Sequence, residues 1–206
     1  MYQHIVFDID GTLINNEEAI LHSLQDVLCE TMGKEFPFEQ LRFALGITGE
    51  DTLKRLGIGN IPVVMVRWVE LLQGYGHMVS VHEGIEELLK TLAGQGYQLG
   101  LASSRTRELM ENDFDNFKIS NFFKIKVCSD DTQEHKPMAG PLLKYMEWAK
   151  AKKEEILYIG DSVHDSMCAR NAGVDFALAV WGSHTKEIPA AYYLSSPAEL
   201  LPVLEK

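Results

Sequence analysis

Short apolar runs that end in polar or glycine-rich turns recur along the chain. They lie at residues 2–7, 98–102, 124–128, 156–159 and 176–180. Most of these runs are rich in residues that favour strands, and they do not alternate strictly between apolar and polar positions. This pattern is typical of strands that are buried on both faces of a parallel sheet.

Helical patterns separate most of these strands. The apolar positions of one pattern share a single helix face: Ile85, Leu88, Leu89 and Leu92. Gly94 and Gly96 follow, and glycines commonly end a helix. Strands that alternate with helices in this way predict an α/β fold with a doubly wound, Rossmann-like parallel sheet.

The segment from residue 15 to about residue 80 breaks the alternation, because it shows no strand signal. One amphipathic stripe covers residues 20–28 and stops at Gly33, and a second covers residues 61–75. Between them, Thr48 is expected to cap a short helix. The pattern predicts a small all-helical unit inserted after the first strand.

The length of 206 residues allows one sizeable core and a small second unit, but not two large domains. We therefore predict a Rossmann-like core formed by residues 1–14 and 81–206, with residues 15–80 forming the small helical unit. The composition indicates no particular oligomeric state.

The formal charge of −11 disfavours nucleic acid and anionic membranes as partners, since both require a cationic face. The three cysteines are widely separated and are expected to be reduced thiols. The first residues do not resemble a signal peptide, and no apolar run approaches the roughly 20 residues that span a bilayer. A cytoplasmic protein is expected. Any phosphate site on such an acidic chain needs local positive charge.

The first strand runs into the segment Phe-Asp-Ile-Asp-Gly-Thr-Leu, which carries Asp8 and Asp10. Ligands of open parallel sheets bind beyond the carboxyl ends of the strands, and side chains two residues apart can point to the same side. Gly11 permits a sharp turn, and Thr12 adds a hydroxyl near it. The pattern favours a functional carboxylate pair over one that only caps the turn.

A second carboxylate pair follows the run at 156–159, in the segment Gly-Asp-Ser-Val-His-Asp that contains Asp161 and Asp165. Mg²⁺ prefers oxygen ligands and typically takes one or two carboxylates together with substrate phosphate. Asp165 could also stabilise the positive end of the helix that follows. Asp161 is therefore the stronger candidate ligand of the two.

Two further strand ends supply hydrogen-bond donors and a positive charge. Ser103 and Ser104 follow the run at 98–102, where a helix is expected to start and where backbone N–H groups bind anions. Ser103 could alternatively only cap that helix. Lys136 follows the run at 124–128 and a polar loop. A lone surface lysine is usually solvated, but an acidic phosphate site needs a fixed cation, and lysine is a recurrent phosphate ligand.

In this order, the segments resemble the four signature motifs of the haloacid-dehalogenase-like hydrolases. The matching residues are Asp8-x-Asp10-Gly-Thr, Ser103, Lys136-Pro137 and Gly160-Asp-Ser-x-x-Asp165. The resemblance covers residues 1 to about 180. The helical insert after the first motif is similar to the cap of the subgroup that includes phosphoglycolate phosphatases and β-phosphoglucomutases.

The resemblance implies a Mg²⁺-dependent phosphatase acting on a small phosphorylated metabolite. It implies that Asp8 attacks phosphorus to form an aspartyl-phosphate, while Asp10 acts as general acid and then as general base. The ion would be held by Asp8, the backbone carbonyl of Asp10 and Asp161, with Asp165 close behind.

The same resemblance implies that Ser103 and Lys136 hold the phosphoryl oxygens during transfer. Thr12, Ser104 and, from the insert, Arg42 are the further candidates for binding substrate. Arg42 is favoured in the insert because it is a cation on an otherwise apolar segment. Other polar residues of the insert could face the substrate or solvent equally well: Thr48, Lys54 and Arg55.

Individual residues distinguish a phosphatase from the other activities of this family. Dehalogenases of this type lack the second aspartate, so Asp10 favours phosphate esters. Sugar-phosphate mutases carry a histidine where this chain has Ile20 and an arginine where it has Gly49, so a hydrolase is favoured over a mutase. A catalytically silent binding protein is disfavoured because every catalytic side chain is present. Phosphoglycolate, a sugar phosphate, a nucleotide and pyrophosphate all remain open as substrates.

Overall fold

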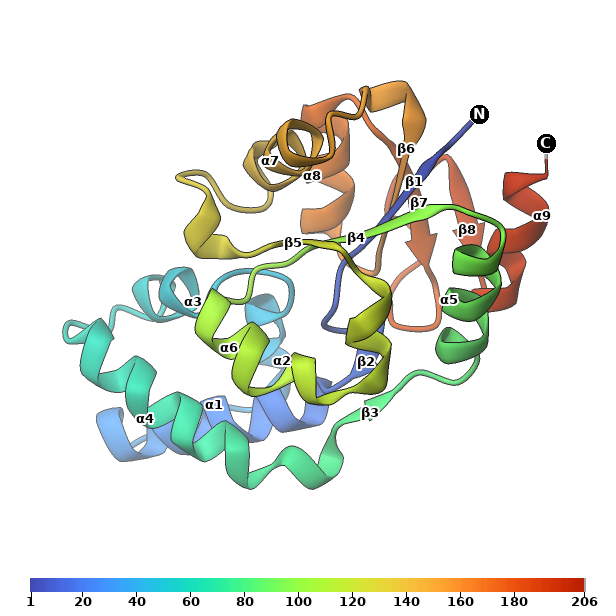
Figure 1. Ribbon diagram of the computed structural model, residues 1–206. Coiled ribbons are helices and arrows are strands. Elements are labelled where there is room, and N and C mark those ends of the chain that lie inside the picture. Colours follow the sequence, from blue (N-terminus) through green and yellow to red (C-terminus); the bar gives the residue numbers. More distant parts are fainter. Residues whose placement is uncertain (206) are drawn as a thin grey trace.

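The computed structural model describes residues 1–205, which form a central six-stranded sheet with helices on both sides (Figure 1). In chain order its strands are β1 (His4–Phe7), β4 (Gln98–Ala102), β5 (Ile125–Val127), β6 (Ile156–Gly160), β7 (Asp175–Ala179) and β8 (Tyr192–Leu194). The order across the sheet is β5-β4-β1-β6-β7-β8, and every neighbouring pair is parallel. The predicted α/β fold with a parallel sheet is confirmed.

Helices cover the two faces of the sheet. They are α5 (Ile85–Gly94), α6 (Arg107–Asn112), α7 (Gly140–Ala149), α8 (Val163–Ala172) and α9 (Leu200–Leu204). Ile5 and Phe7 of β1 pack in one apolar cluster with residues of α5, α6 and α9, whereas Val6 packs in another with residues of α7 and α8. Because successive strand residues point to opposite faces, these two clusters make the sheet doubly wound.

Four helices between β1 and β3 form a separate layer below the sheet edge in Figure 1: α1 (Glu17–Met32), α2 (Phe38–Leu41), α3 (Gly49–Arg55) and α4 (Ile61–Gly74). We call residues 16–79 the helical insert. It has an apolar cluster of its own, with Leu24, Leu53 and Trp68 at its centre. As predicted, α1 ends at Gly33, and the Thr48 side chain caps α3 by accepting from the Asp51 N–H at 3.1 Å.

A short antiparallel ladder joins the two ends of the helical insert to the sheet domain. It pairs β2 (Ile14–Asn15) with β3 (Ser80–Val81). The sequence showed no strand signal here because two-residue strands are too short to produce a periodic pattern. Strand β8 was also not anticipated. Short 3₁₀ segments complete the fold at Arg42–Ala44, Gly76–Met78, Phe114–Asn116, Lys118–Phe122, Ser129–Asp131, Lys153–Glu155 and Pro197–Glu199.

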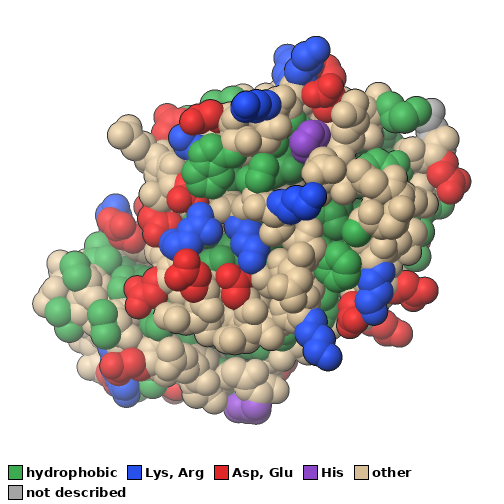
Figure 2. Space-filling model, viewed as in Figure 1, with side chains coloured by type: hydrophobic (Ala, Val, Ile, Leu, Met, Phe, Trp, Pro, Cys, Tyr) green, Lys and Arg blue, Asp and Glu red, His purple; other side chains and the backbone are tan. Residues whose placement is uncertain are grey.

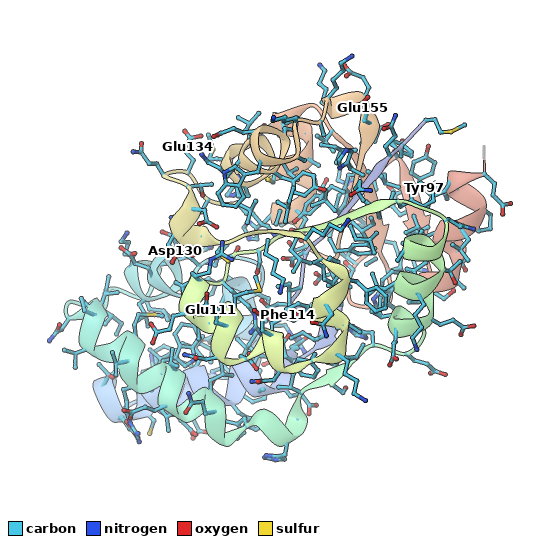
Figure 3. The ribbon with its side chains drawn as sticks, viewed as in Figure 1. Tyr97, Glu111, Phe114, Asp130, Glu134 and Glu155 are labelled. Atoms are coloured by element: carbon cyan, nitrogen blue, oxygen red, sulfur yellow. The ribbon has the colours of Figure 1, made fainter. Side chains whose placement is uncertain are left out.

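The loop between β4 and α6 is fixed by apolar contacts beneath it. Phe114, labelled in Figure 3, follows α6 and is fully buried. Its ring lies 6.3 Å from the rings of both Phe117 and Phe123. These contacts hold α6 against the sheet, and thereby fix residues 103–106, which lie just before it. The helix starts later than expected, at Arg107, and its cap is Thr106 rather than Ser103.

The surface shown in Figure 2 carries acidic and basic side chains side by side, with apolar side chains gathered over α4. Val63 and Val66 of this helix are 61% and 62% exposed. Among residues 1–205, no helix combines the length and apolar character needed to cross a bilayer.

Candidate active site

The sequence motifs meet at the carboxyl edge of the sheet. Asp8 follows β1 directly, Ser103 follows β4, and Asp161 follows β6. These three strands are neighbours in the sheet. Lys136 reaches the same place from the segment between β5 and α7, since its Nζ lies 2.7 Å from Asp8 Oδ1. Asp8 and Asp161, which are 153 positions apart in sequence, therefore belong to one site.

Lys136 bridges two buried carboxylates at the centre of this site. Its Nζ lies 2.7 Å from Asp8 Oδ1 and 2.7 Å from Asp165 Oδ1. The three side chains are at most 3% exposed. The Asp165 carboxylate also accepts hydrogen bonds from Tyr158 and from Ser162, whose own hydroxyl caps α8. Asp165 thus combines the two roles considered from the sequence, helix capping and proximity to the acidic site.

Three carboxylates in the site lie close enough together to contribute ligands to one divalent ion. Oxygens of Asp8, Asp161 and Asp165 lie within 4.8 Å of one another. Burial raises the pKa of Asp8 to about 7 despite the nearby Lys136, and burial together with the charges of Asp165 and Asp8 raises the pKa of Asp161 well above its usual value. One lysine leaves this cluster with an excess of negative charge, so its oxygen donors suit Mg²⁺.

Asp10 has a different environment from Asp8. Its Oδ1 accepts from Arg105 Nη2 at 2.7 Å, and its Oδ2 accepts from Arg105 Nε at 3.0 Å. The Asn16 amide donates to the same carboxylate, and Arg105 also pairs with Asp113. Burial alone would raise the pKa of Asp10, but the charge and hydrogen bonds of Arg105 outweigh it and hold that pKa below its usual value.

Two close approaches explain the glycines of the site. Gly11 has φ +78°, and a Cβ there would lie 2.4 Å from Asp161 Oδ2. A Cβ on Gly182 would lie 1.8 Å from the Gly11 carbonyl oxygen. Thr12 is held from both sides, since its Oγ1 donates to Asp161 Oδ1 at 2.8 Å and its carbonyl accepts from the Trp181 indole at 2.9 Å. Any larger residue at 11 or 182 would displace this turn.

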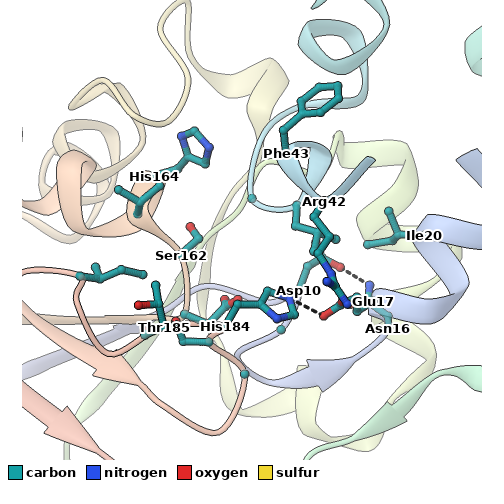
Figure 4. Close-up of a pocket in the computed structure, with 18 of the residues that line it drawn as sticks. Asp10, Asn16, Glu17, Ile20, Arg42, Phe43, Ser162, His164, His184 and Thr185 are labelled. Carbon is teal, nitrogen blue, oxygen red and sulfur yellow. Dashed lines mark hydrogen bonds and ion pairs between the residues drawn. The ribbon is translucent and has the colours of Figure 1, made fainter. Parts of the chain in front are cut away.

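A cavity of about 370 Å³ lies between the helical insert and the carboxyl edge of the sheet (Figure 4). We call it the interface cavity. The insert contributes residues between 16 and 20 and between 42 and 46, and the sheet side contributes Asp10, Gly11, 161–164 and residues between 182 and 189. The Ser104 hydroxyl donates to the Gly46 carbonyl at 3.1 Å and so connects the two sides.

The candidate residues of the insert have different positions. Arg42 lines the interface cavity. Lys54 does not, and its Nζ lies 2.7 Å from Glu50 on the same helix. Arg55 is exposed and lies over the ring of Phe43, at 4.5 Å from its centroid. Thr48 is buried as the cap of α3. Among these four candidates, Arg42 has the position expected of a substrate contact.

Sequence reasoning did not assign a role to Arg105, Asn16, Glu17 or His184. Arg105 had a detectable signal, since it lies two residues after Ser103 and an acidic site needs more than one cation. Glu17 and His184 are 167 positions apart, yet their side chains are 2.7 Å apart in the interface cavity. No local pattern marks such a pair.

Comparison with known proteins agrees with the fold and the site. The model of the family described as haloacid dehalogenase-like hydrolase matches residues 5–179. The chain therefore belongs to this family of hydrolases.

Relatives and solved structures match the chain over almost its whole length. It is 28% identical to Pyrophosphatase PpaX of Bacillus mycoides, over 98% of this chain and 96% of the relative, and 29% identical to the protein of the same name in Bacillus cereus, over 97% and 95%. A crystal structure from Lactobacillus plantarum, provisionally named a phosphoglycolate phosphatase, superposes with a TM-score of 0.89 at 29% identity, over 98% of this chain and 99% of that one. A haloacid dehalogenase-like hydrolase structure from Bacteroides fragilis gives 0.88 at 25%, over 97% and 100%.

Proposed function

We propose that this protein is a Mg²⁺-dependent phosphatase that cleaves a small phosphate ester through an aspartyl-phosphate on Asp8. The observation that carries the proposal is the arrangement of buried Asp8, Lys136 and Asp165 with half-buried Asp161 at the carboxyl edge of the sheet. A nucleophile beside a fixed cation and a divalent-ion site is the combination that phosphoryl transfer requires.

In the first step, an Asp8 carboxylate oxygen forms a bond to phosphorus while the bond from phosphorus to the leaving-group oxygen breaks. Asp10, in its protonated form, gives its proton to that oxygen. Lys136 and Ser103 hold the phosphoryl oxygens, with Thr12 and Ser104 nearby. Mg²⁺, held by Asp8, the Asp10 carbonyl and Asp161 with Asp165 behind them, would neutralise charge between the carboxylate and the phosphate.

In the second step, water attacks phosphorus and Asp10 accepts the water proton. The bond between Asp8 and phosphorus breaks, inorganic phosphate leaves, and both carboxylates return to their starting states. The contact between Arg105 and Asp10 favours the ionised carboxylate, which is the form that this second step uses. For the first step Asp10 must carry a proton, so we expect the contact with Arg105 to loosen when substrate binds.

Residues 15–80, which contain the helical insert, are proposed to act as a cap that closes over a core of residues 1–14 and 81–206. Closure would exclude water from the leaving-group step. The interface cavity, with Arg42 on its wall, is proposed to hold the leaving group. Ile20 lines this cavity as well, and its apolar side chain offers no acid or base for the second transfer of a mutase. The names of the relatives bring pyrophosphate and phosphoglycolate forward as candidate substrates.

The proposal is tested by inorganic phosphate release from p-nitrophenyl phosphate, phosphoglycolate, pyrophosphate and several sugar phosphates. The assay is run with Mg²⁺, with EDTA, and with Asp8→Asn, which keeps the shape of the side chain but removes the nucleophile. We expect turnover that needs the metal and that falls at least about 10⁴-fold in the variant, because the covalent route is lost. Circular dichroism confirms that Asp8→Asn is folded. Equal turnover by the folded variant would overturn the proposal.

A further inference from the structure

The side chains of Glu17, Arg42 and His184 meet in the interface cavity (Figure 4). Glu17 is the first residue of α1, Arg42 belongs to the 3₁₀ segment after α2, and His184 lies in the loop between β7 and β8. Glu17 Oε1 accepts from Arg42 Nε at 3.2 Å, and Glu17 Oε2 lies 2.7 Å from His184 Nε2. Each oxygen of one carboxylate therefore has its own donor, one from the insert and one from the sheet domain.

The Glu17 carboxylate lies in the more protected part of this cluster. Its side chain is 26% exposed, compared with 45% for Arg42 and 52% for His184. The preceding residue, Asn16, donates to the carboxylate of Asp10. Glu17 and Asp10, the proposed proton donor to the leaving-group oxygen, both line the interface cavity that is proposed to hold the leaving group.

The catalytic carboxylates do not depend on these two donors. Asp10 has Arg105 as its counter-cation, and Asp161 accepts from Thr12. Arg42 and His184 are directed instead at Glu17. The carboxylate of a glutamate is joined to Cα through two methylene groups, so it can reach other positions by rotation about these bonds. An anion of similar size could take the same two donors once Glu17 turned away.

We propose that Arg42 and His184 form an anion-binding subsite for the leaving group, and that Glu17 fills this subsite until substrate binds. The inference rests on the phosphatase function proposed above and specifies its substrate class: a phosphate compound whose leaving group carries its own negative charge, either a carboxylate or a second phosphate. A neutral leaving group cannot replace the charge of Glu17, so its entry would exchange a charged acceptor for neutral ones or for water. An anionic leaving group replaces one charged partner with another.

The first test compares two esters that differ only in this charge, 2-phosphoglycolate and 2-hydroxyethyl phosphate, with pyrophosphate as a third substrate. The measured quantity is the ratio of kcat/KM for a charged substrate to kcat/KM for the neutral ester. A hydrogen bond to a charged group contributes enough that its loss changes binding about 10- to 100-fold. We therefore expect Arg42→Met and His184→Gln each to lower the ratio about tenfold or more.

Glu17→Gln distinguishes a substrate-binding subsite from a latch, by which we mean a contact that only holds the insert against the sheet domain. Removing the competing charge should raise the ratio several-fold, on the order of threefold to tenfold, because the leaving group no longer displaces an anion. A latch would instead make all three variants change the two esters alike. The matched control is Arg67→Met, which removes an arginine of the same insert that is paired with Glu30 of α1, outside the interface cavity. It should leave the ratio unchanged.

The outcomes separate this inference from the phosphatase proposal. If both esters are cleaved in an Asp8-dependent way but the three variants leave the ratio unchanged, the subsite is wrong and the phosphatase stands. If a charged substrate is favoured and the variants act as described, the larger effect on phosphoglycolate or on pyrophosphate indicates whether the charge is a carboxylate or a phosphate.

A binding measurement covers the case in which no ester is cleaved and the phosphatase proposal fails. Glycolate and inorganic phosphate are titrated separately while the imidazole resonance of His184 is followed by NMR, and that resonance is identified by its absence in His184→Gln. A saturable shift that is weakened about tenfold in Arg42→Met would support an anion site. Absence of any shift with both anions would overturn it.

Discussion

At the scale of single residues, different cations contact the two aspartates proposed as nucleophile and as acid/base. Lys136 contacts Asp8, and Arg105 contacts Asp10. The consequences differ, because burial raises the pKa of Asp8 to about 7 whereas Arg105 holds the pKa of Asp10 below its usual value. The chain thus distinguishes two aspartates only two positions apart by the side chains that reach them from β4 and from the segment before α7.

Replacement of Arg105 tests this division of roles. In Arg105→Met the ionised form of Asp10 loses its counter-cation, so the general-base step becomes slower. We expect kcat for p-nitrophenyl phosphate to fall about 10- to 100-fold, with a burst of p-nitrophenol as the aspartyl-phosphate accumulates. Rapid-quench kinetics measures both effects.

Arg107→Met provides the control for this prediction. Arg107 lies two residues further along the chain and pairs with Asp131 instead of Asp10. Its replacement should leave the burst and kcat close to those of the unmodified protein. A loss of kcat in Arg105→Met without a burst would show that Arg105 acts on the first step or on folding alone.

The sequence predicted Asp8 and Asp161 at strand ends and Lys136 beyond the loop that follows the run at 124–128, since each follows a recognisable apolar run. It did not predict the partners of Glu17 or Asp10. A loop residue such as His184 has no periodic neighbours, and its contacts depend on how the β7–β8 loop meets the insert. Contacts between distant loops are set by tertiary structure alone.

At the scale of elements, the helical insert is stabilised by a core of its own. Trp68 of α4 is 8% exposed, and its indole donates to the hydroxyl of Ser23 on α1 at 3.0 Å. Ser23 is itself fully buried. The contact joins the two longest helices of the insert, α1 and α4, so it holds the wall that carries Glu17 in place.

Truncation of this tryptophan should loosen the insert. We expect Trp68→Ala to lower the free energy of unfolding by about 3–5 kcal/mol, because it opens a cavity and leaves the Ser23 hydroxyl without its donor. Urea unfolding measures the change. Val66→Ala in the same helix removes a side chain that is 62% exposed and should stay within about 0.5 kcal/mol. Equal losses in both variants would contradict a central role for Trp68.

Elements with a strong periodic signal were predicted well, and weak ones were not. The run at 156–159 became β6 (Ile156–Gly160), and the stripe that stops at Gly33 became α1. The ladder of β2 and β3 was not predicted because each strand contains only two residues. The two strands pair only because the fold of the insert brings its two ends together. Helix α6 starts later than expected because its N-cap is Thr106 and not Ser103. The Thr106 side chain accepts a hydrogen bond from the Leu109 N–H.

At the scale of the whole molecule, the fold accumulates buried negative charge at one edge of the sheet. The buried or half-buried carboxylates Asp8, Asp161 and Asp165 share one neighbouring lysine. Burial, together with the charges of neighbouring carboxylates, raises the pKa of both Asp8 and Asp161 and so opposes their ionisation. The folded chain should therefore be under electrostatic strain that a bound divalent cation relieves.

Mg²⁺ should accordingly stabilise the whole protein against unfolding. Binding to the folded state alone adds about 2.7 kcal/mol at a concentration of 100 times Kd, which raises Tm by several degrees. In Asp161→Asn one charge of the cluster is lost, so Tm without metal should be equal or higher while the Mg²⁺-dependent rise becomes much smaller. Calorimetry with Mg²⁺ and with EDTA measures both quantities.

Asp175→Asn is the matched control for the metal prediction, because this exposed carboxylate accepts from Tyr2 at the opposite end of β7 from the site. It should keep the full response to Mg²⁺. A full response in Asp161→Asn would contradict the assignment of Asp161 as a ligand, whereas a lower Tm without metal would show that its carboxylate serves folding through Thr12. The sign of the Tm change in metal-free Asp161→Asn therefore distinguishes the two roles. An equal or higher Tm indicates a carboxylate that serves metal binding, and a lower Tm indicates one that stabilises the fold.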